Sequence, residues 1–207
     1  MIIGITGGTA SGKTTLVSAI VAELNLENVC VISQDCYYKK TTNLSHKERM
    51  AQNFDHPDAI DFDLLATQLQ ALKDNKPILQ PVYSFITHNR TSAQKTIVPK
   101  KIIIVEGILI FNDKRILDLL DLTIFIHADA EERLRRRIYR DSKERGRDMD
   151  EVLKRYKTTL KPMHNLYIEP FRSTSDFVFD NTEVTQSISK NIINIIQERT
   201  VKTHETN

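Results

Sequence analysis

The feature that most constrains this chain is the stretch GGTASGKT at residues 7–14. It matches the spacing G-x-x-x-x-G-K-[ST] at Gly7, Gly12, Lys13 and Thr14. An apolar run at 2–5 precedes it, and apolar residues recur at helical spacing over 16–24. A glycine loop between a strand and a helix binds phosphate, because the N–H groups of the helix N-terminus carry partial positive charge. The sequence therefore predicts a phosphate-binding loop (P-loop).

The loop also predicts a nucleotide and a metal ion. Lys13 would reach the β- and γ-phosphates, and the Thr14 hydroxyl would ligate Mg²⁺. Glu106 ends the apolar run 102–105 and is the predicted second acid on the magnesium side. The residues predicted to hold the nucleotide are Gly7, Gly8, Thr9, Ala10, Ser11, Gly12, Lys13, Thr14 and Thr15.

Strand and helix patterns alternate along the whole chain. Strands are expected at 2–5, 29–32, 101–107, 122–127 and 177–179, and helices from 13, over 63–72, from 129, near 150 and over 188–196. Alternation of this kind is typical of an α/β fold with a parallel sheet flanked by helices. We expect a single P-loop NTPase domain over 1–200, with a substrate-binding excursion at 36–98, an arginine-bearing lid at 133–148 and a frayed tail at 201–207.

Composition indicates an ordinary globular protein. Hydrophobic residues make up 40% of the chain and charged residues 27%, which is enough apolar surface for a core. Cys30 and Cys36 are too few for a disulfide framework and suggest reduced thiols in a cytoplasmic protein. The longest apolar stretch, at 102–111, is interrupted by Glu106 and Gly107, so no membrane span is expected.

Positive charge is concentrated in RLRRRIYRDSKERGR at 133–147. Eight basic and two acidic residues give this segment a net charge of +6, whereas the whole chain carries +2, so the remainder carries −4. A nucleic-acid-binding protein usually has a wider basic surface. We therefore expect a phosphate lid and no nucleic-acid partner.

The spacing of the arginines supports a lid. Arg133, Arg136, Arg137 and Arg140 lie at i, i+3, i+4 and i+7 of a helix that Asp129 and Glu132 would open as a capping box. Gly146 would end the helix and place Arg145 and Arg147 on a turn. For Arg133 and Arg135 a solvated helix face with surface salt bridges is the favoured alternative.

The motifs favour a small-molecule kinase over a GTP-dependent switch. A guanine-specific site normally carries N-K-x-D, and here Asn75–Lys76 is followed by Pro77 and Ile78. A kinase must exclude water and neutralise the transferring phosphoryl group, and an arginine-bearing lid does both. Asp35 follows the predicted strand at 29–32 and lies at the sheet edge where ligands bind, so it could accept the proton of an attacking hydroxyl.

Seven motifs within residues 2–170 together resemble those of the uridine–cytidine kinases, among the phosphoribulokinase-like P-loop kinases. They read GGTASGKTT, SQDCYY, NFDHPDAIDFD, PVYSFITHNR, IIVEGILIF, RRIYRDSKERGRD and LKPMHNLYIEP. The resemblance implies phosphorylation of uridine or cytidine at the 5′-hydroxyl in pyrimidine salvage, with ATP or GTP as donor and Mg²⁺ as cofactor. It also implies a homotetramer that responds to pyrimidine triphosphates.

The resemblance further implies residue roles. Asp35 would be the general base, with Lys13, Arg140 and Arg145 stabilising the transferred charge. Asp55 would bind the ribose 2′- and 3′-hydroxyls, since a carboxylate can accept from two adjacent donors. The other implied substrate contacts are Tyr38, Tyr83, Phe85, His88, Arg137 and Arg147.

Two departures from the family pattern bear on specificity. A Pro-Arg-Gly-Gly-like run near the adenine is replaced here by FDNTE at 179–183, and Arg155 stands where relatives often carry glutamine. Two alternatives stay open at this point. One is a related kinase of another hydroxylated metabolite, such as pantothenate or a sugar phosphate. The other is a nucleotide-dependent RNA-binding protein without enzymatic activity, which would show strongly salt-dependent RNA affinity.

Overall fold

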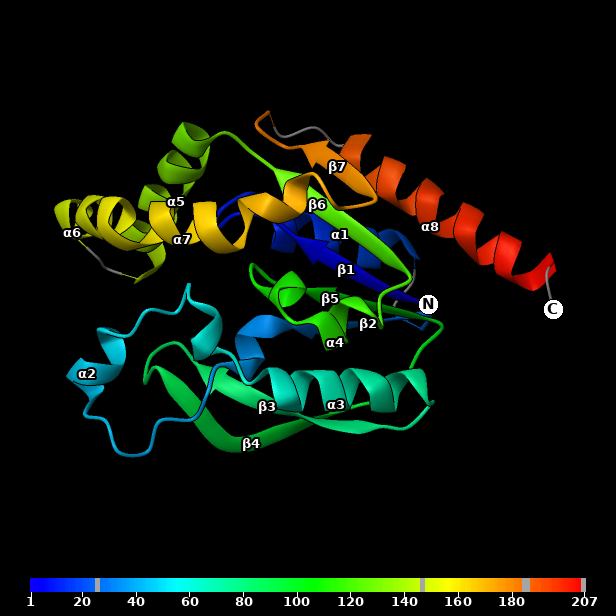
Figure 1. Ribbon diagram of the computed structural model, residues 1–207, viewed down its shortest axis with the longest axis horizontal. Coiled ribbons are helices and arrows are strands. Elements are labelled where there is room, and N and C mark those ends of the chain that lie inside the picture. The colour runs from blue at the N-terminus through cyan, green and yellow to red at the C-terminus, as the bar shows by residue number, and fades with distance from the viewer. Residues whose placement is uncertain (25–26, 146–147, 184–186, 206–207) are drawn as a thin grey trace.

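The computed structural model describes residues 1–24, 27–145, 148–183 and 187–205, with side chains throughout except at 144–145 and 201–205 (Figure 1). Five strands form a parallel sheet in the order β2-β5-β1-β6-β7. They are β1 (Ile2–Thr6), β2 (Val29–Ser33), β5 (Ile102–Glu106), β6 (Leu122–His127) and β7 (Phe177–Asp180). The predicted parallel sheet flanked by helices is confirmed.

The helices that follow these strands cover both faces of the sheet (Figure 1). The α-helices are α1 (Lys13–Leu24), α2 (His46–Met50), α3 (Phe62–Lys73), α4 (Lys114–Leu117), α5 (Ala130–Arg145), α6 (Met149–Arg155), α7 (Lys161–Tyr167) and α8 (Ser187–Glu205). Short helical turns are η1 (Gln34–Tyr37), η2 (Pro57–Ala59), η3 (Ile110–Asn112) and η5 (Glu169–Arg172), and η4 (Tyr156–Leu160) is a π-helix between α6 and α7.

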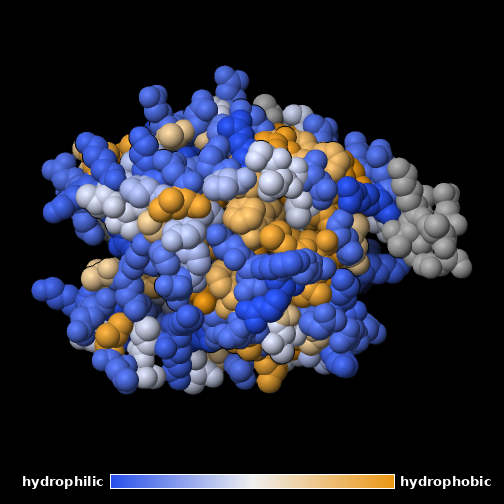
Figure 2. Space-filling view, in the orientation of Figure 1, coloured by the Kyte–Doolittle hydropathy of each residue, from blue (hydrophilic) through white to orange (hydrophobic). Residues whose placement is uncertain are grey.

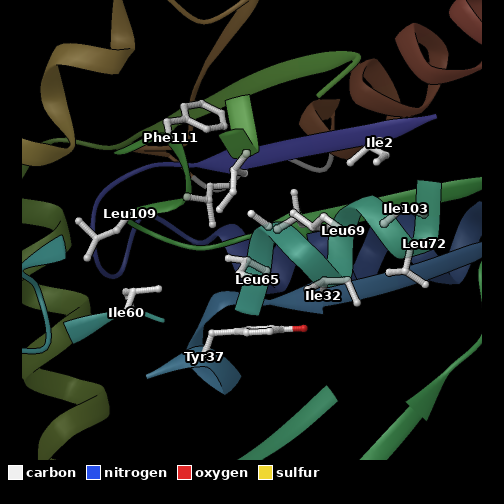
Figure 3. Close-up of a cluster of buried hydrophobic side chains, with 14 of the residues drawn as sticks. Ile2, Ile32, Tyr37, Ile60, Leu65, Leu69, Leu72, Ile103, Leu109 and Phe111 are labelled. Carbon is white, nitrogen blue, oxygen red and sulfur yellow. The ribbon is translucent and has the colours of Figure 1, made fainter. Parts of the chain in front are cut away.

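Two apolar cores lie on opposite faces of the sheet because side chains alternate along each strand. In β1, Ile2 belongs to the core beneath α3 and α4, whereas Ile3 and Ile5 belong to the core beneath α1 and α8. Figure 3 shows the first of these cores, with Leu65, Leu69 and Leu72 of α3 packed against the sheet. Strands that are apolar on both faces need helices on both faces, which explains the layered architecture.

Within the predicted excursion at 36–98, where no strand was expected, the chain forms a regular antiparallel hairpin of β3 (Ile78–Ser84) and β4 (Asn89–Ile97). Its register shifts between Pro81 and Tyr83, and most of β4 is exposed. Exposure on both faces removes the apolar alternation that would have revealed this strand in the sequence. The hairpin carries the loop 85–88 toward the sheet edge.

Among the described residues, no helix is long and apolar enough to cross a membrane.

Candidate active site

A cavity of about 530 Å³ lies where β1, β2 and β5 end. Fifteen of the predicted site residues line it, namely Thr9, Ala10, Gly12, Lys13, Thr14, Thr15, Asp35, Tyr38, Asp55, Tyr83, Phe85, His88, Glu106, Arg137 and Arg140. Gly7, Gly8 and Ser11 are buried within the loop itself. At its left edge, Figure 2 shows a hydrophilic notch between the α6 side and the α2 side of the molecule.

The P-loop needs glycine at two positions. The φ angles of Gly7 and Gly12 are +146° and +93°, a region that side chains disfavour. A Cβ on Gly7 would lie 2.1 Å from the Ile126 carbonyl oxygen, and one on Gly12 would lie 2.3 Å from Asn181 Nδ2. The segments that contain Ile126 and Asn181 therefore pack closely against the loop, and the side of the loop that faces the cavity stays open to a ligand.

Lys13 is buried and turns back onto the loop. Its Nζ donates to the carbonyl oxygens of Gly7 at 2.8 Å and Gly8 at 3.0 Å. Burial lowers the pKa of Lys13 to about 8, although Glu106 and Asp35 oppose this shift by attraction. The ammonium group thus lies in an unfavourable environment that an anionic ligand would improve.

Two carboxylates lie near Lys13 at the carboxyl ends of the neighbouring strands β2 and β5. Glu106 ends β5 opposite Ser33 in the sheet register, and the Ser33 hydroxyl donates to Glu106 Oε1 at 2.6 Å. Burial raises the pKa of Glu106, while the Ser33 bond and Lys13 counteract that rise. Asp35 lies in η1, directly after β2. The parallel register explains why both acids meet at one edge.

Asp55 reaches the cavity from the loop between α2 and α3. Asp55 is only 7% exposed, and burial raises the pKa of its carboxyl group. The positive charges of Arg137 and Arg155 oppose this rise. Tyr38 lies between the two acids. Its pKa is raised well above the usual range, first by burial, then by the charges of Asp35 and Asp55 and a hydrogen bond with Asp35. Tyr38 therefore stays neutral, and its hydroxyl is hydrogen-bonded to Asp35.

An aromatic cluster forms the far wall of the cavity. Phe54 stacks on His88 at 5.7 Å and 26°, and its ring meets Tyr38 edge-on at 5.1 Å. Tyr83 lies 5.1 Å from Tyr38 and 5.3 Å from Phe85, and burial raises the pKa of Tyr83 to about 12. Flat apolar surfaces with polar tips suit a heteroaromatic base.

Arg137 connects the loop side of the cavity to the Asp55 side. Its Nη1 donates to Thr9 Oγ1 at 2.7 Å, and its Nε lies 3.2 Å from Asp141 Oδ2. Burial lowers the pKa of Arg137, while Asp55 and Asp141 oppose the shift. Arg140 lines the same cavity beside Asp141.

Arg136 holds the FDNTE segment against the P-loop. Its Nη2 donates to the carbonyl oxygens of Asn181 at 2.9 Å and Thr182 at 2.8 Å, and its Nε pairs with Glu132. Asn181 Nδ2 in turn donates to the Ser11 carbonyl oxygen at 2.8 Å. The segment that departs from the family pattern thus supports the loop that would bind phosphate.

Two sequence-based expectations for α5 were wrong. Arg133 is not solvated: it is 6% exposed, packs against Gly8 and donates from Nε to the Ala128 carbonyl oxygen at 3.0 Å. Glu132 does not close a capping box, because its carboxylate binds Arg135 and Arg136, and the Asp129 N–H donates to Thr182 Oγ1. Arg135 lies on a solvated helix face, as the alternative predicted, and its surface salt bridge is to Glu132.

Two predicted lid arginines cannot be placed, and some lining residues were not predicted. Arg147 and the side chain of Arg145 lie outside the described residues. Phe54, Arg136, Gly107, Ile108 and Arg155 also line the cavity. The position of Phe54 beside Asp55 in NFDHPDA was the available signal. Arg155 was noted only as a departure, and it donates to the carbonyl oxygens of Gln52 at 3.1 Å and Met50 at 3.5 Å.

The donor set suits Mg²⁺. The Thr14 hydroxyl and the carboxylate of Glu106 line one cavity, and such hard oxygen ligands are the ones magnesium prefers. Within the described ranges, no group of three or more His, Cys, Asp or Glu residues could enclose a metal ion. The remaining ligands would be phosphate oxygens and water, which is how magnesium commonly binds beside nucleotides.

Residues 2–188 match the family described as Phosphoribulokinase / Uridine kinase. The chain belongs to this family. A uridine kinase of Brevibacillus brevis is 40% identical over 210 residues, covering 100% of this chain and 98% of that protein. A uridine kinase of Chlamydia pneumoniae is 42% identical over 208 residues, covering 100% of this chain and 91% of that protein. The predicted family resemblance is confirmed.

Solved structures of other kinases share the fold of this chain. The phosphoribulokinase of Rhodobacter spheroides superposes with a TM-score of 0.62 at 17% identity, covering 86% of this chain and 69% of that one. At this identity the likeness concerns the fold alone. The P-loop kinase architecture predicted from the sequence is confirmed.

Proposed function

We propose that this family member is a uridine kinase that transfers the γ-phosphoryl group of ATP to the 5′-hydroxyl of uridine or cytidine in pyrimidine salvage. One observation carries the proposal: a phosphate-binding loop, a candidate base, a buried carboxylate and an aromatic wall share one cavity of about 530 Å³. Full-length similarity to proteins described as uridine kinases supports the same reaction.

Each part of the cavity has a proposed task. The P-loop amides and Lys13 bind the phosphates, and Arg140 stabilises charge on the transferring group. Asp35, oriented by Tyr38, accepts the proton of the 5′-hydroxyl. Arg137 bridges the phosphate side and the acceptor side through Thr9 and Asp55.

The acceptor would be held by the opposite wall. Asp55 accepts hydrogen bonds from the ribose 2′- and 3′-hydroxyls, and the pyrimidine lies against Tyr83, Phe85 and His88. Thr14 and Glu106 would hold Mg²⁺, which supplies charge neutralisation at the phosphates when bound. Arg145 and Arg147 keep the lid roles that the family resemblance implies.

The decisive experiment measures ADP release from Mg-ATP with uridine, cytidine or no acceptor, in the wild type and in Asp35→Asn. Loss of the general base should lower nucleoside-stimulated turnover by about 10²- to 10⁴-fold. Uridine binding, measured by calorimetry, should persist. Asp118→Asn, which changes an exposed surface carboxylate paired with Lys114, is the matched control and should leave turnover unchanged. Full turnover in Asp35→Asn would remove this residue from the mechanism.

Pantothenate and ribulose 5-phosphate belong in the same assay because Arg137, Arg140 and Arg155 make the acceptor side basic. The aromatic wall and Asp55 favour a neutral nucleoside with a vicinal diol over a sugar phosphate. Stimulation by ribulose 5-phosphate without stimulation by uridine would replace the proposed substrate. GTP in place of ATP tests the donor, which the FDNTE segment leaves open.

We place the reaction in the cytoplasm and propose a homotetramer, as the family resemblance implies. Light scattering coupled to size-exclusion chromatography tests the assembly directly. A mass near four times the chain mass of 23.8 kDa is expected. A mass that stays at one chain over the micromolar range would exclude the tetramer.

A further inference from the structure

In the part of the chain that the structure describes, a side-chain pair joins the loop that carries Asp55 to α7. The Tyr167 hydroxyl lies 2.9 Å from His56 Nε2, across 111 residues of sequence. The two rings also meet edge-on, with centroids 4.9 Å apart and an interplanar angle of 76°. In Figure 1 the cyan segment between α2 and α3 rises toward α7, where this contact forms. His56 directly follows Asp55, so this contact is made one residue away from the carboxylate proposed to bind the acceptor.

The hydrogen-bond network assigns the direction of this contact. The Asp58 backbone N–H donates to His56 Nδ1 at 3.1 Å and caps η2. In the neutral ring, a nitrogen that accepts leaves the proton on the other nitrogen. Nε2–H therefore donates to the Tyr167 oxygen. One imidazole thus performs two separable tasks, a local cap through Nδ1 and a long-range tether through Nε2.

Tyr167 is itself held at the catalytic edge of the sheet. Asn112 Nδ2 donates to the Tyr167 carbonyl oxygen at 2.8 Å and to the Leu109 carbonyl oxygen at 3.2 Å. Asn112 ends η3, which follows β5 and its terminal Glu106. A continuous path of hydrogen bonds and short backbone therefore joins the Asp55 loop to the strand end that faces Lys13.

Position matters for a carboxylate borne on a loop. The Asp55 N–H bonds only locally, to Asn53 Oδ1 at 3.1 Å, a contact that moves with the loop. Asp55 must nevertheless meet an acceptor whose reacting hydroxyl is aligned with Asp35 on a different element. Site residues generally need support that holds them to about 0.5 Å. Within the part of the chain that the structure describes, the tether offers such support from the sheet side.

We propose that Tyr167 and His56 are positioning residues, whose hydrogen bond fixes Asp55 relative to the phosphate-transfer edge and thereby sets selection for acceptors with a vicinal diol. The inference rests on the proposed uridine kinase activity for its kinetic readout. The structural readout, protection of the Asp55 loop against amide hydrogen exchange, is independent of that activity.

Three variants separate the tether from the cap. Tyr167→Phe removes the hydroxyl and keeps the ring. His56→Gln can place an amide near the position of Nε2 and keep the tether, whereas His56→Asn can place an oxygen near the position of Nδ1 and keep only the cap. Tyr139→Phe, at an exposed tyrosine on α5, is the matched control.

The kinetic probe is kcat/KM for uridine divided by kcat/KM for 2′,3′-dideoxyuridine, with Mg-ATP. One neutral hydrogen bond is worth about a fivefold effect, so Tyr167→Phe and His56→Asn should lower this ratio by about that factor. The uridine KM should rise in both, with kcat and the ATP KM changed by less than about twofold. His56→Gln and Tyr139→Phe should keep the wild-type ratio.

Amide hydrogen exchange of peptides spanning 50–60 provides the readout that needs no turnover. Exchange should be faster in Tyr167→Phe and His56→Asn, with unchanged protection of β1 and β5. An unchanged uridine ratio in Tyr167→Phe, or a loss in His56→Gln with none in His56→Asn, would overturn the tether. Absence of uridine-stimulated turnover in the wild type would overturn the proposed function instead, and the exchange data would still decide the tether.

Discussion

At the scale of single residues, Lys13 shows how the loop is prepared for an anion. The ammonium group is buried, and within the described part of the chain it donates its hydrogen bonds to the neutral carbonyl oxygens of Gly7 and Gly8. Desolvation therefore outweighs the attraction of Glu106 and Asp35, and the pKa falls to about 8. The charged form costs stability in the ligand-free protein, and bound phosphate would relieve that cost.

This lowered pKa predicts a rise in stability with pH. Between the folded pKa of about 8 and the unfolded value of 10.5, the unfolded chain binds more protons at Lys13 than the native state. The free energy of unfolding should therefore rise between pH 8 and pH 10, by about 1–3 kcal/mol. Urea denaturation of the wild type and Lys13→Met at several pH values measures it. An equal rise in Lys13→Met would assign the effect to other groups.

At the scale of elements, α5 combines two kinds of arginine on one helix. Arg133 and Arg137 point to the P-loop and are buried, whereas Arg135 is exposed and pairs with Glu132. Helical spacing identified Arg133 and Arg137 as neighbours on one face, yet could not say what that face contacts. The packing of α5 against Gly8 and Thr9 makes this face part of the site.

A matched pair of substitutions on α5 tests this difference. Arg133→Ala opens a cavity beside Gly8, and it also removes the hydrogen-bond donor of the Ala128 carbonyl oxygen. The free energy of unfolding should therefore fall by about 1–3 kcal/mol. Arg135→Ala removes an exposed ion pair and should cost about 0.5 kcal/mol or less. Chemical denaturation of both variants provides the comparison. Equal losses would mean that Arg133 is not packed as described.

At the scale of the whole molecule, one parallel sheet separates the two apolar cores and contributes side chains to both. Every strand of that sheet except the edge strands β2 and β7 pairs on both sides, and β5 contributes to both cores through alternating side chains. The β3–β4 hairpin forms a separate two-stranded sheet. Global stability should therefore depend on the parallel sheet far more than on the outer face of the hairpin.

Two truncations to alanine test that distribution. Ile104 is fully buried in β5, and Ile104→Ala should lower the free energy of unfolding by about 2–4 kcal/mol through lost burial and a cavity. Leu79 in β3 is 53% exposed, and Leu79→Ala should cost about 1 kcal/mol or less. Urea denaturation of both proteins is the measurement. A loss at Leu79 equal to that at Ile104 would place the hairpin within the main cooperative unit.

Local patterns were sufficient to predict the sheet and much of the site. The glycine spacing at 7–14 predicted the loop, and the apolar runs predicted strands buried on both faces. Parallel strands end at a common edge, so Asp35 and Glu106 were each predicted at the ligand-binding side of the sheet, and both line the cavity. The motif resemblance added Asp55 and the aromatic residues, whose roles remain proposals.

Tertiary structure decided what depends on contacts between distant segments. The sequence by itself determined where the strands of the parallel sheet and the longer helices form, because their periodicity and glycine requirements are local. Burial of Arg133, the regular pairing of β4, the closure of Asn181 onto the P-loop and the bond from Tyr167 to His56 were not local. Each depends on which surface packs opposite a residue, and only the assembled molecule brings those surfaces together.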